Sequence, residues 1–322
     1  MCNEFNKVEM KFTDFIPANW FKDPVNSSVW ITGFRIARGE KSELANGHTI
    51  DLIGTRALVI YGQIAYLVND TNWELNEQGI PSCKVNVKNI KTPVGFWLII
   101  MAPYKIDGVE GSEADVKRAI SSSTGFLAAF AGRNAVYEKI YENILDIGSG
   151  YATIFSPVFL NPGASPKPNF SRANISLINE AVKKIANLDK RTISRLELAF
   201  HWYEEALKDS GRDAFLKSWI ALEVLAMPDS TNIRPVNEAL ARAYGKTIDE
   251  TTKTFGVGRI FGLRSRIVHN GEVLPIKFVL EEYIQAIFAD VLCDMLQINP
   301  YYQAEVIRNK PEFDFEKILT GN

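Results

Sequence analysis

The chain has 322 residues, a formal net charge of −2 at pH 7 and 46% hydrophobic residues. This composition is typical of an ordinary globular protein, and the length suits two domains. The near-neutral charge excludes a molecule-wide basic field, so any contact with nucleic acid requires a local basic patch.

Cysteine usage and hydropathy indicate the compartment. Cys2, Cys83 and Cys293 are odd in number and far apart, which argues against a disulfide framework and against a cysteine zinc site. The first twelve residues lack the apolar segment of a signal peptide, and the apolar run 95–104 is too short to cross a bilayer. We expect a cytoplasmic protein with no membrane partner.

The first hundred residues have the pattern of strands. Runs rich in β-branched and aromatic residues are punctuated by Asn, Gly and Pro, and they cover 29–38, 57–68, 84–89 and 96–101. They predict a small antiparallel sheet or sandwich.

The pattern changes at Ser112, which is followed by acids typical of a first helical turn. Two helices are predicted here, over 114–132 and over 134–148, the second ending at Gly148. Three prolines then mark 161–171 as a connector. We place a β-rich N-terminal domain with trailing helices at 1–165.

Residues 171–322 are predicted to be a helical bundle. Helical periodicity or continuous apolar character is found in 191–209, 213–227, 252–269 and 277–297, with a weaker segment at 235–246. Segment 213–227 is apolar on almost every side and is predicted to be central. Short connections favour four or five antiparallel helices, so the fold class is α+β.

One window of the bundle is clearly basic. No acid lies between Thr251 and Asn270, whereas this window holds Lys253, Arg259, Arg264 and Arg266 and runs into the stretch LRSRIVHNGE, 263–272. The simplest interpretation is a helix end, because cations favour the C-terminal dipole and Asn270-Gly271 is a typical stop.

The alternative is a phosphate site. Histidine transfers protons near neutral pH, and arginine binds phosphate oxygens bidentately. Arg266 and His269 are three residues apart and share a helix face. Arg264 and His269 are five apart, about 140° on a continuous α-helix, so we expect them to converge only if the helix ends between them.

Glu223 interrupts the apolar stretch WIALEVLAM. An isolated buried carboxylate is costly, so we expect an ion pair with Arg264 or Arg266. The alternative is that Glu223 faces a groove and contacts water.

These residues resemble a known family. ALE in an apolar helix, followed by a helix that runs into LRSRIVHNG, resembles HEPN domains, most closely the ApeA-like group of prokaryotic defence proteins. Nuclease members carry an arginine and a histidine a few residues apart, matched here by Arg264 and His269 with four residues between them, and Ser265 matches a polar residue that commonly follows the arginine. The resemblance covers about 171–300, and 125–142 also looks like the segment preceding the domain.

The resemblance implies a metal-independent endoribonuclease without a cofactor, acting in anti-phage defence or abortive infection. Two such domains pair as a homodimer around one composite site. His269 would act as general acid or base, and Arg264 would stabilise the charged phosphorane. The products would be a 2′,3′-cyclic phosphate and a 5′-hydroxyl.

The same resemblance implies supporting roles and partners. Arg266, Lys253 and Arg259 would bind the backbone of RNA, with transfer RNA as one candidate substrate. Ser265 and Asn270 would orient the catalytic pair, and Glu223 would form a structural ion pair. The N-terminal domain would sense an unknown trigger.

Two alternatives stay open. A HEPN module can bind or dimerise without cutting, and a HEPN toxin can be masked by an antitoxin partner. Three scattered histidines argue against a metal site, and His201, between Phe200 and Trp202, is expected to be packed.

Overall fold

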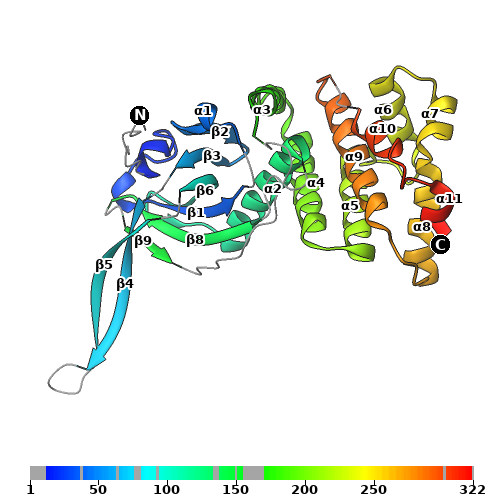
Figure 1. The fold of residues 1–322 in the computed structure, drawn as a ribbon. Coiled ribbons are helices and arrows are strands. Elements are labelled where there is room, and N and C mark those ends of the chain that lie inside the picture. The colour runs from blue at the N-terminus through cyan, green and yellow to red at the C-terminus, as the bar shows by residue number, and fades with distance from the viewer. Residues whose placement is uncertain are drawn as a thin grey trace, which may run out of the picture. The chain divides into compact units, whose positions relative to one another are not determined.

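The computed structural model describes two compact units. Its described residues are 12–36, 39–62, 65–75, 81–91, 94–132, 138–148, 151–154, 170–299 and 302–320. One unit comprises Met1–Ile120 and Asn134–Asn174, and the other comprises Ser121–Arg133 and Ile175–Asn322. A sheet dominates the first and helices the second, which confirms the α+β class (Figure 1).

The first unit is built on one sheet, whose strand order is β2-β3-β6-β1-β8-β9-β4-β5, with β7 beside β6. All pairs are antiparallel except β4 with β9. The strands are β1 (Ser28–Arg35), β2 (His48–Leu52), β3 (Thr55–Gly62), β4 (Ala65–Leu75), β5 (Pro81–Lys91), β6 (Gly95–Ile106), β7 (Val109–Glu110), β8 (Glu138–Asp146) and β9 (Tyr151–Ile154). Strands are confirmed in 29–38, 84–89 and 96–101, whereas the predicted segment 57–68 is divided between β3 and β4. All of these strands lie in one sheet rather than a sandwich.

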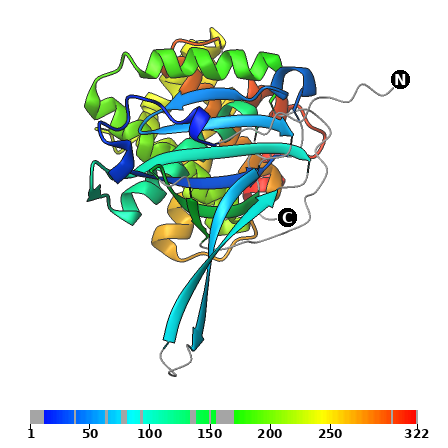
Figure 2. The ribbon, with the colours of Figure 1, turned by 90° about the vertical axis from the view of Figure 1, so that its left-hand side faces the viewer.

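The hairpin β4–β5 pairs from Ala65 with Lys91 to Leu75 with Pro81 and extends away from the rest of its sheet (Figure 2). The sheet core instead lies on the strands around β1 and β6, because β1 is buried almost throughout and β6 is buried from Trp97 to Ala102. One core cluster comprises Phe21, Val29, Ile31, Leu58, Ile60, Trp97, Ile99, Met101 and Leu145. Short helices flank these strands: η1 (Phe12–Phe15), η2 (Pro24–Asn26) and α1 (Lys41–Leu44).

The predicted helix over 134–148 is wrong, since β8 occupies most of that segment. β8 pairs with β1 from Ser28 opposite Asp146 to Arg35 opposite Glu138. Residues four apart in sequence share a face in a helix and equally in a strand, so the spacing of apolar residues does not separate the two structures. The segment forms a strand rather than a helix because the edge of β1 offers unpaired backbone groups, and β8 completes the backbone hydrogen bonds of β1.

The predicted helix over 114–132 is confirmed as α2 (Glu113–Ala131). Its second half groups with the helical unit, whereas we place it in the N-terminal domain from sequence. Most of the proline-rich connector, residues 161–169, lies outside the described residues.

The second unit contains more helices than the four or five predicted. They are α3 (Arg172–Ile185), α4 (Lys190–Lys208), α5 (Gly211–Ala226), α6 (Arg234–Tyr244), α7 (Ile248–Phe255), α8 (Val257–Asn270), α9 (Phe278–Met295), α10 (Gln303–Arg308) and α11 (Phe315–Thr320). Segments 191–209, 213–227 and 277–297 are confirmed as α4, α5 and α9. The most buried of these helices is α9, where every residue from Val279 to Cys293 except Glu282 is buried, and α5 packs against it.

The predicted helix over 252–269 is divided in two at Gly256. This residue has φ 59°, a left-handed conformation that ends α7 and begins α8. A Cβ atom there would lie 2.9 Å from the Phe315 ring, so glycine satisfies both the backbone and the packing. In the described ranges, no helix combines the length and apolarity needed to cross a membrane.

Candidate functional site

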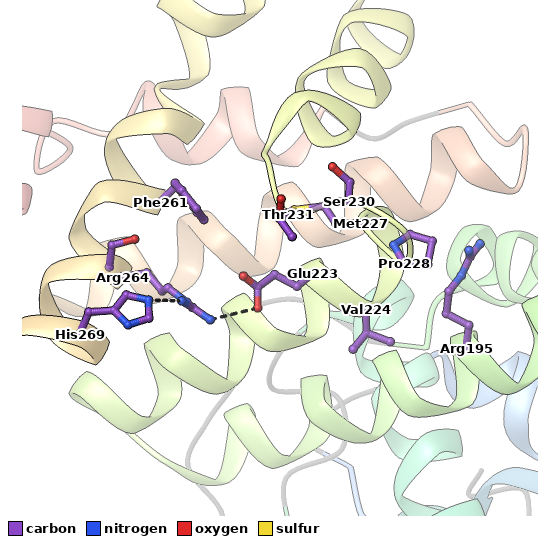
Figure 3. Close-up of a pocket in the computed structure, with 11 residues that line it drawn as sticks. Arg195, Glu223, Val224, Met227, Pro228, Ser230, Thr231, Phe261, Arg264 and His269 are labelled. Carbon is purple, nitrogen blue, oxygen red and sulfur yellow. Dashed lines mark hydrogen bonds and ion pairs between the residues drawn. The ribbon is translucent and has the colours of Figure 1, made fainter.

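A pocket of about 590 Å³ opens in the helical unit (Figure 3). Its size falls within the roughly 300–1,000 Å³ of small-molecule sites. The residues lining it come from α4, α5, the segment after α5, and α8: Arg195, Glu223, Val224, Met227, Pro228, Ser230, Thr231, Phe261, Arg264, Ser265 and His269. The pocket therefore includes both predicted catalytic residues.

Arg264 and His269 meet at one end of this pocket. Nη1 of Arg264 lies 3.4 Å from Nε2 of His269 (Figure 3). A guanidinium only donates hydrogen bonds, so this contact requires an unprotonated Nε2 on the imidazole. The arrangement places a fixed positive charge beside a nitrogen that is able to accept a proton.

The expectation that α8 must end between these two residues is wrong. α8 is continuous to Asn270, and the side chains still meet. Two features explain the contact. The arginine side chain is long enough to reach around the helix, and the N–H of Gly271 bonds to the carbonyl of Arg266, a spacing one residue longer than in a regular α-turn. Gly271, at φ 66°, then ends the helix as predicted.

Glu223 holds the other side of the Arg264 guanidinium. Its Oε2 lies 3.5 Å from Nη2, and the two side chains are 26% and 23% exposed. The predicted pairing with Arg264 is confirmed. The alternative, that Glu223 faces a groove and contacts water, holds as well, because the carboxylate lines the pocket and its side chain is partly exposed. The guanidinium thus lies between a carboxylate and an imidazole.

Ser265 and Asn270, the other two predicted supporting residues, differ in their position relative to the pocket. Ser265 lines the pocket, whereas Asn270 is exposed at the end of α8 and does not line it. The proposed orienting role therefore has geometric support for Ser265 alone.

The three predicted RNA-binding cations lie outside the pocket lining. Nη2 of Arg266 donates to the carbonyl of Leu319 at 3.0 Å. Arg259 pairs with Glu316 at 2.9 Å and lies over a phenylalanine ring of α11. Lys253 is exposed on α7. Two of the three side chains therefore secure the C-terminal segment onto α8.

Sequence reasoning missed the far end of the pocket, where Arg195 lies. α4 and α5 are joined only by Asp209 and Ser210 and pack side by side, so the start of α4 lies beside the end of α5. That hairpin geometry was the available signal, because it brings Arg195 toward Pro228. The hydroxyls of the segment after α5 have no distinctive sequence pattern.

His201 belongs to a separate polar cluster. Its Nδ1 lies 2.9 Å from Oγ of Ser121, which donates to Glu204 at 2.8 Å, and Glu204 also pairs with Lys208 at 2.6 Å. Burial raises the pKa of Glu204, against the opposing effect of the lysine. The packed role expected for His201 is confirmed, since this cluster joins α2 to α4.

No protein-family model, curated protein or solved structure matches the chain. Its chemistry must therefore be argued from its own residues. Over the described part of the chain, no three His, Cys, Asp or Glu side chains gather as a metal site would require.

Proposed function

We propose that the helical unit is a HEPN-type, metal-independent endoribonuclease with its site at Arg264 and His269. The observation that carries the proposal is the 3.4 Å separation of the guanidinium and imidazole nitrogens at one end of a pocket. This pair matches the chemistry of RNA cleavage, which needs a proton acceptor beside a fixed positive charge.

The two side chains have distinct roles in the proposed reaction. When the Arg264 guanidinium turns from Nε2 of His269 to the phosphate, Nε2 takes the proton of a ribose 2′-hydroxyl, and the 2′-oxygen forms a bond to phosphorus. Arg264 stabilises the charge that develops on the phosphoryl oxygens. The bond from phosphorus to the 5′-oxygen then breaks, leaving a 2′,3′-cyclic phosphate and a 5′-hydroxyl. In a paired arrangement, the proton for the leaving oxygen comes from the imidazolium of the second copy.

Glu223 acts on this reaction through Arg264. A carboxylate 3.5 Å from Nη2 of the guanidinium holds it at the pocket, and the N–H groups that contact neither Glu223 nor His269 are available to phosphate. Ser265 lines the same wall and is a candidate for orienting the pair. Arg259, Arg266 and Lys253 remain predictions as cations that bind RNA beyond the pocket.

The wider proposal rests on the resemblance of the sequence. It comprises a cytoplasmic homodimer, RNA such as transfer RNA as substrate, and a β-rich unit that responds to a phage or cellular trigger. Fold alone supports none of these partners, so each depends on the activity test.

The test incubates purified protein with total RNA and with transfer RNA in EDTA. Wild type is expected to release cyclic-phosphate ends, and His269→Ala to reduce the rate roughly 10²- to 10⁴-fold by loss of the general base. Val268→Ala is the matched control, because Val268 is 47% exposed on the same helix and does not line the pocket. Cleavage that persists in His269→Ala would overturn the role of this residue.

A second function is favoured by one observation. The Arg264–Glu223 ion pair partly neutralises the guanidinium that the reaction needs. A non-catalytic HEPN module that binds or dimerises fits this state. Intact RNA after incubation with dimeric protein, together with measurable RNA binding that Arg264→Gln weakens, would support this function over cleavage.

A further inference from the structure

Arg195 lies at the opposite end of the pocket from Arg264 and His269. Figure 3 shows Glu223 and Val224 between these two ends. Nε of Arg195 is buried, and no described residue accepts a hydrogen bond from it. The rest of the side chain is partly exposed and lines the pocket. A buried donor without a partner costs free energy, so a ligand that brings an acceptor to this guanidinium would stabilise the site.

Neighbouring cations differ from Arg195 in this respect. Arg191, one turn earlier on α4, pairs with Asp229 at 3.3 Å, and Arg264 pairs with Glu223. The pocket lining contains two arginines and one carboxylate, so it carries a positive charge even with His269 neutral. A ligand with negative charge at both ends matches this distribution.

The space between the two ends suits a nucleoside. Val224, Met227 and Phe261 form apolar wall, while Ser230 and Thr231 add hydroxyls able to bond sugar or base edges. The Phe261 ring packs against buried Trp219 with centroids 6.0 Å apart, so it is a supported surface for a base. The volume of about 590 Å³ accommodates one nucleotide.

Resting on the ribonuclease function proposed above, we propose that Arg195 is a substrate-positioning residue that binds an RNA phosphate adjacent to the one cleaved. One nucleotide then occupies the pocket between Arg195 and the Arg264–His269 pair. Binding at both ends fixes the cleaved phosphate against His269, because a chain held at two points loses its freedom to slide.

The first experiment measures the salt dependence of RNA binding in a His269→Ala background, where no cleavage interferes. Arg195→Ala is expected to weaken binding of a short single-stranded RNA roughly tenfold. It should also reduce the slope of log K against log salt by about 0.7, the value for one lost contact to a single-strand phosphate. Arg195→Lys should retain the slope, because it keeps the charge.

Arg212→Ala is the matched control for this experiment. Arg212 lies on α5, keeps 52% of its side chain exposed and does not line the pocket. Its removal should leave affinity and slope unchanged. If the slope of log K against log salt falls equally in Arg212→Ala and Arg195→Ala, Arg195 contributes only to the overall positive charge of the protein. That result would overturn the proposal.

A second experiment changes the RNA instead of the protein and so avoids any folding defect. Neutral methylphosphonate replaces the phosphate on the 5′ or the 3′ side of the cleaved one, in separate oligonucleotides. One of these two modified oligonucleotides should bind protein that retains Arg195 about tenfold more weakly than unmodified RNA does. The same oligonucleotide should bind Arg195→Ala as tightly as unmodified RNA does. The proposal would be overturned if, for both oligonucleotides, the loss of affinity from methylphosphonate adds to the loss from Arg195→Ala, and if Arg195→Ala leaves the slope of log K against log salt unchanged.

These outcomes separate the two proposals. If wild type cleaves RNA while affinity, slope and kcat/KM are unaffected in Arg195→Ala, the role of Arg195 fails and the ribonuclease stands. If Arg195→Ala shows the expected losses but wild type never cleaves, the pocket binds RNA and the cleavage proposal fails. If neither wild type nor any of the variants binds RNA, both the ribonuclease proposal and the role of Arg195 fail.

Discussion

The ion pair between Glu223 and Arg264 allows a prediction of stability from its geometry. At 3.5 Å, two unit charges in a medium of effective dielectric constant 20 attract by about 5 kcal/mol. Both side chains are about a quarter exposed, so water screens this attraction. Fully exposed pairs contribute about 0–1 kcal/mol, and breaking a buried pair costs about 3–5 kcal/mol. We expect Glu223→Gln to lower the free energy of unfolding by about 1–2 kcal/mol.

A double-mutant cycle isolates this interaction. Wild type, Glu223→Gln, Arg264→Gln and the double variant are unfolded in urea and followed by far-ultraviolet circular dichroism, which reports chiefly on the helical unit. The coupling energy should be about 1 kcal/mol. Glu238→Gln is the matched control, because its partner Arg234 is 74% exposed on the same helix, and the expected loss is under about 0.5 kcal/mol.

The result that refutes this reasoning is additivity. If the losses in the single variants sum to that of the double variant within about 0.3–0.5 kcal/mol, the two charges do not interact in the folded state. The position of Arg264 at the pocket would then need another cause.

Three further outcomes are expected. Gly256→Ala should lower the free energy of unfolding by about 1–3 kcal/mol, because φ is 59° and the new Cβ would meet Phe315; an unchanged melting temperature would contradict this. Burial raises the pKa of Glu204 above its ordinary value of 4.5, so the carboxyl holds its proton more tightly in the folded state than in the unfolded state. The free energy of unfolding, relative to that of Glu204→Gln, should therefore fall as the pH rises from 4.5 through the folded pKa. A free energy of unfolding that rises over this pH interval would contradict the raised pKa. Arg266→Met should speed amide exchange in α11, whose carbonyl it binds, while exchange in α4 stays the same.

Local pattern was sufficient for much of the helical unit. Residues 191–209, 213–227 and 277–297 form helices where their periodicity predicts them, and the glycine after Asn270 ends α8 as its chemistry requires. Glu223 needed an ion-pair partner for an energetic reason that is visible in sequence, since its helical neighbours are apolar. Such predictions succeed because each depends on residues close together in the chain.

The sequence by itself determined the α+β class and the basic window, since composition, period and charge are local properties, and its resemblance to HEPN domains made Arg264 and His269 the candidate pair. Only tertiary structure decided that 138–146 joins the sheet, because a partner strand offers hydrogen bonds that no local pattern records. It also decided that Arg195 shares a pocket with His269, 74 residues away in the chain, and that Arg266 donates a hydrogen bond to the carbonyl of Leu319. Contacts between distant residues depend on how whole helices pack, and that packing is settled by the summed burial of their apolar faces.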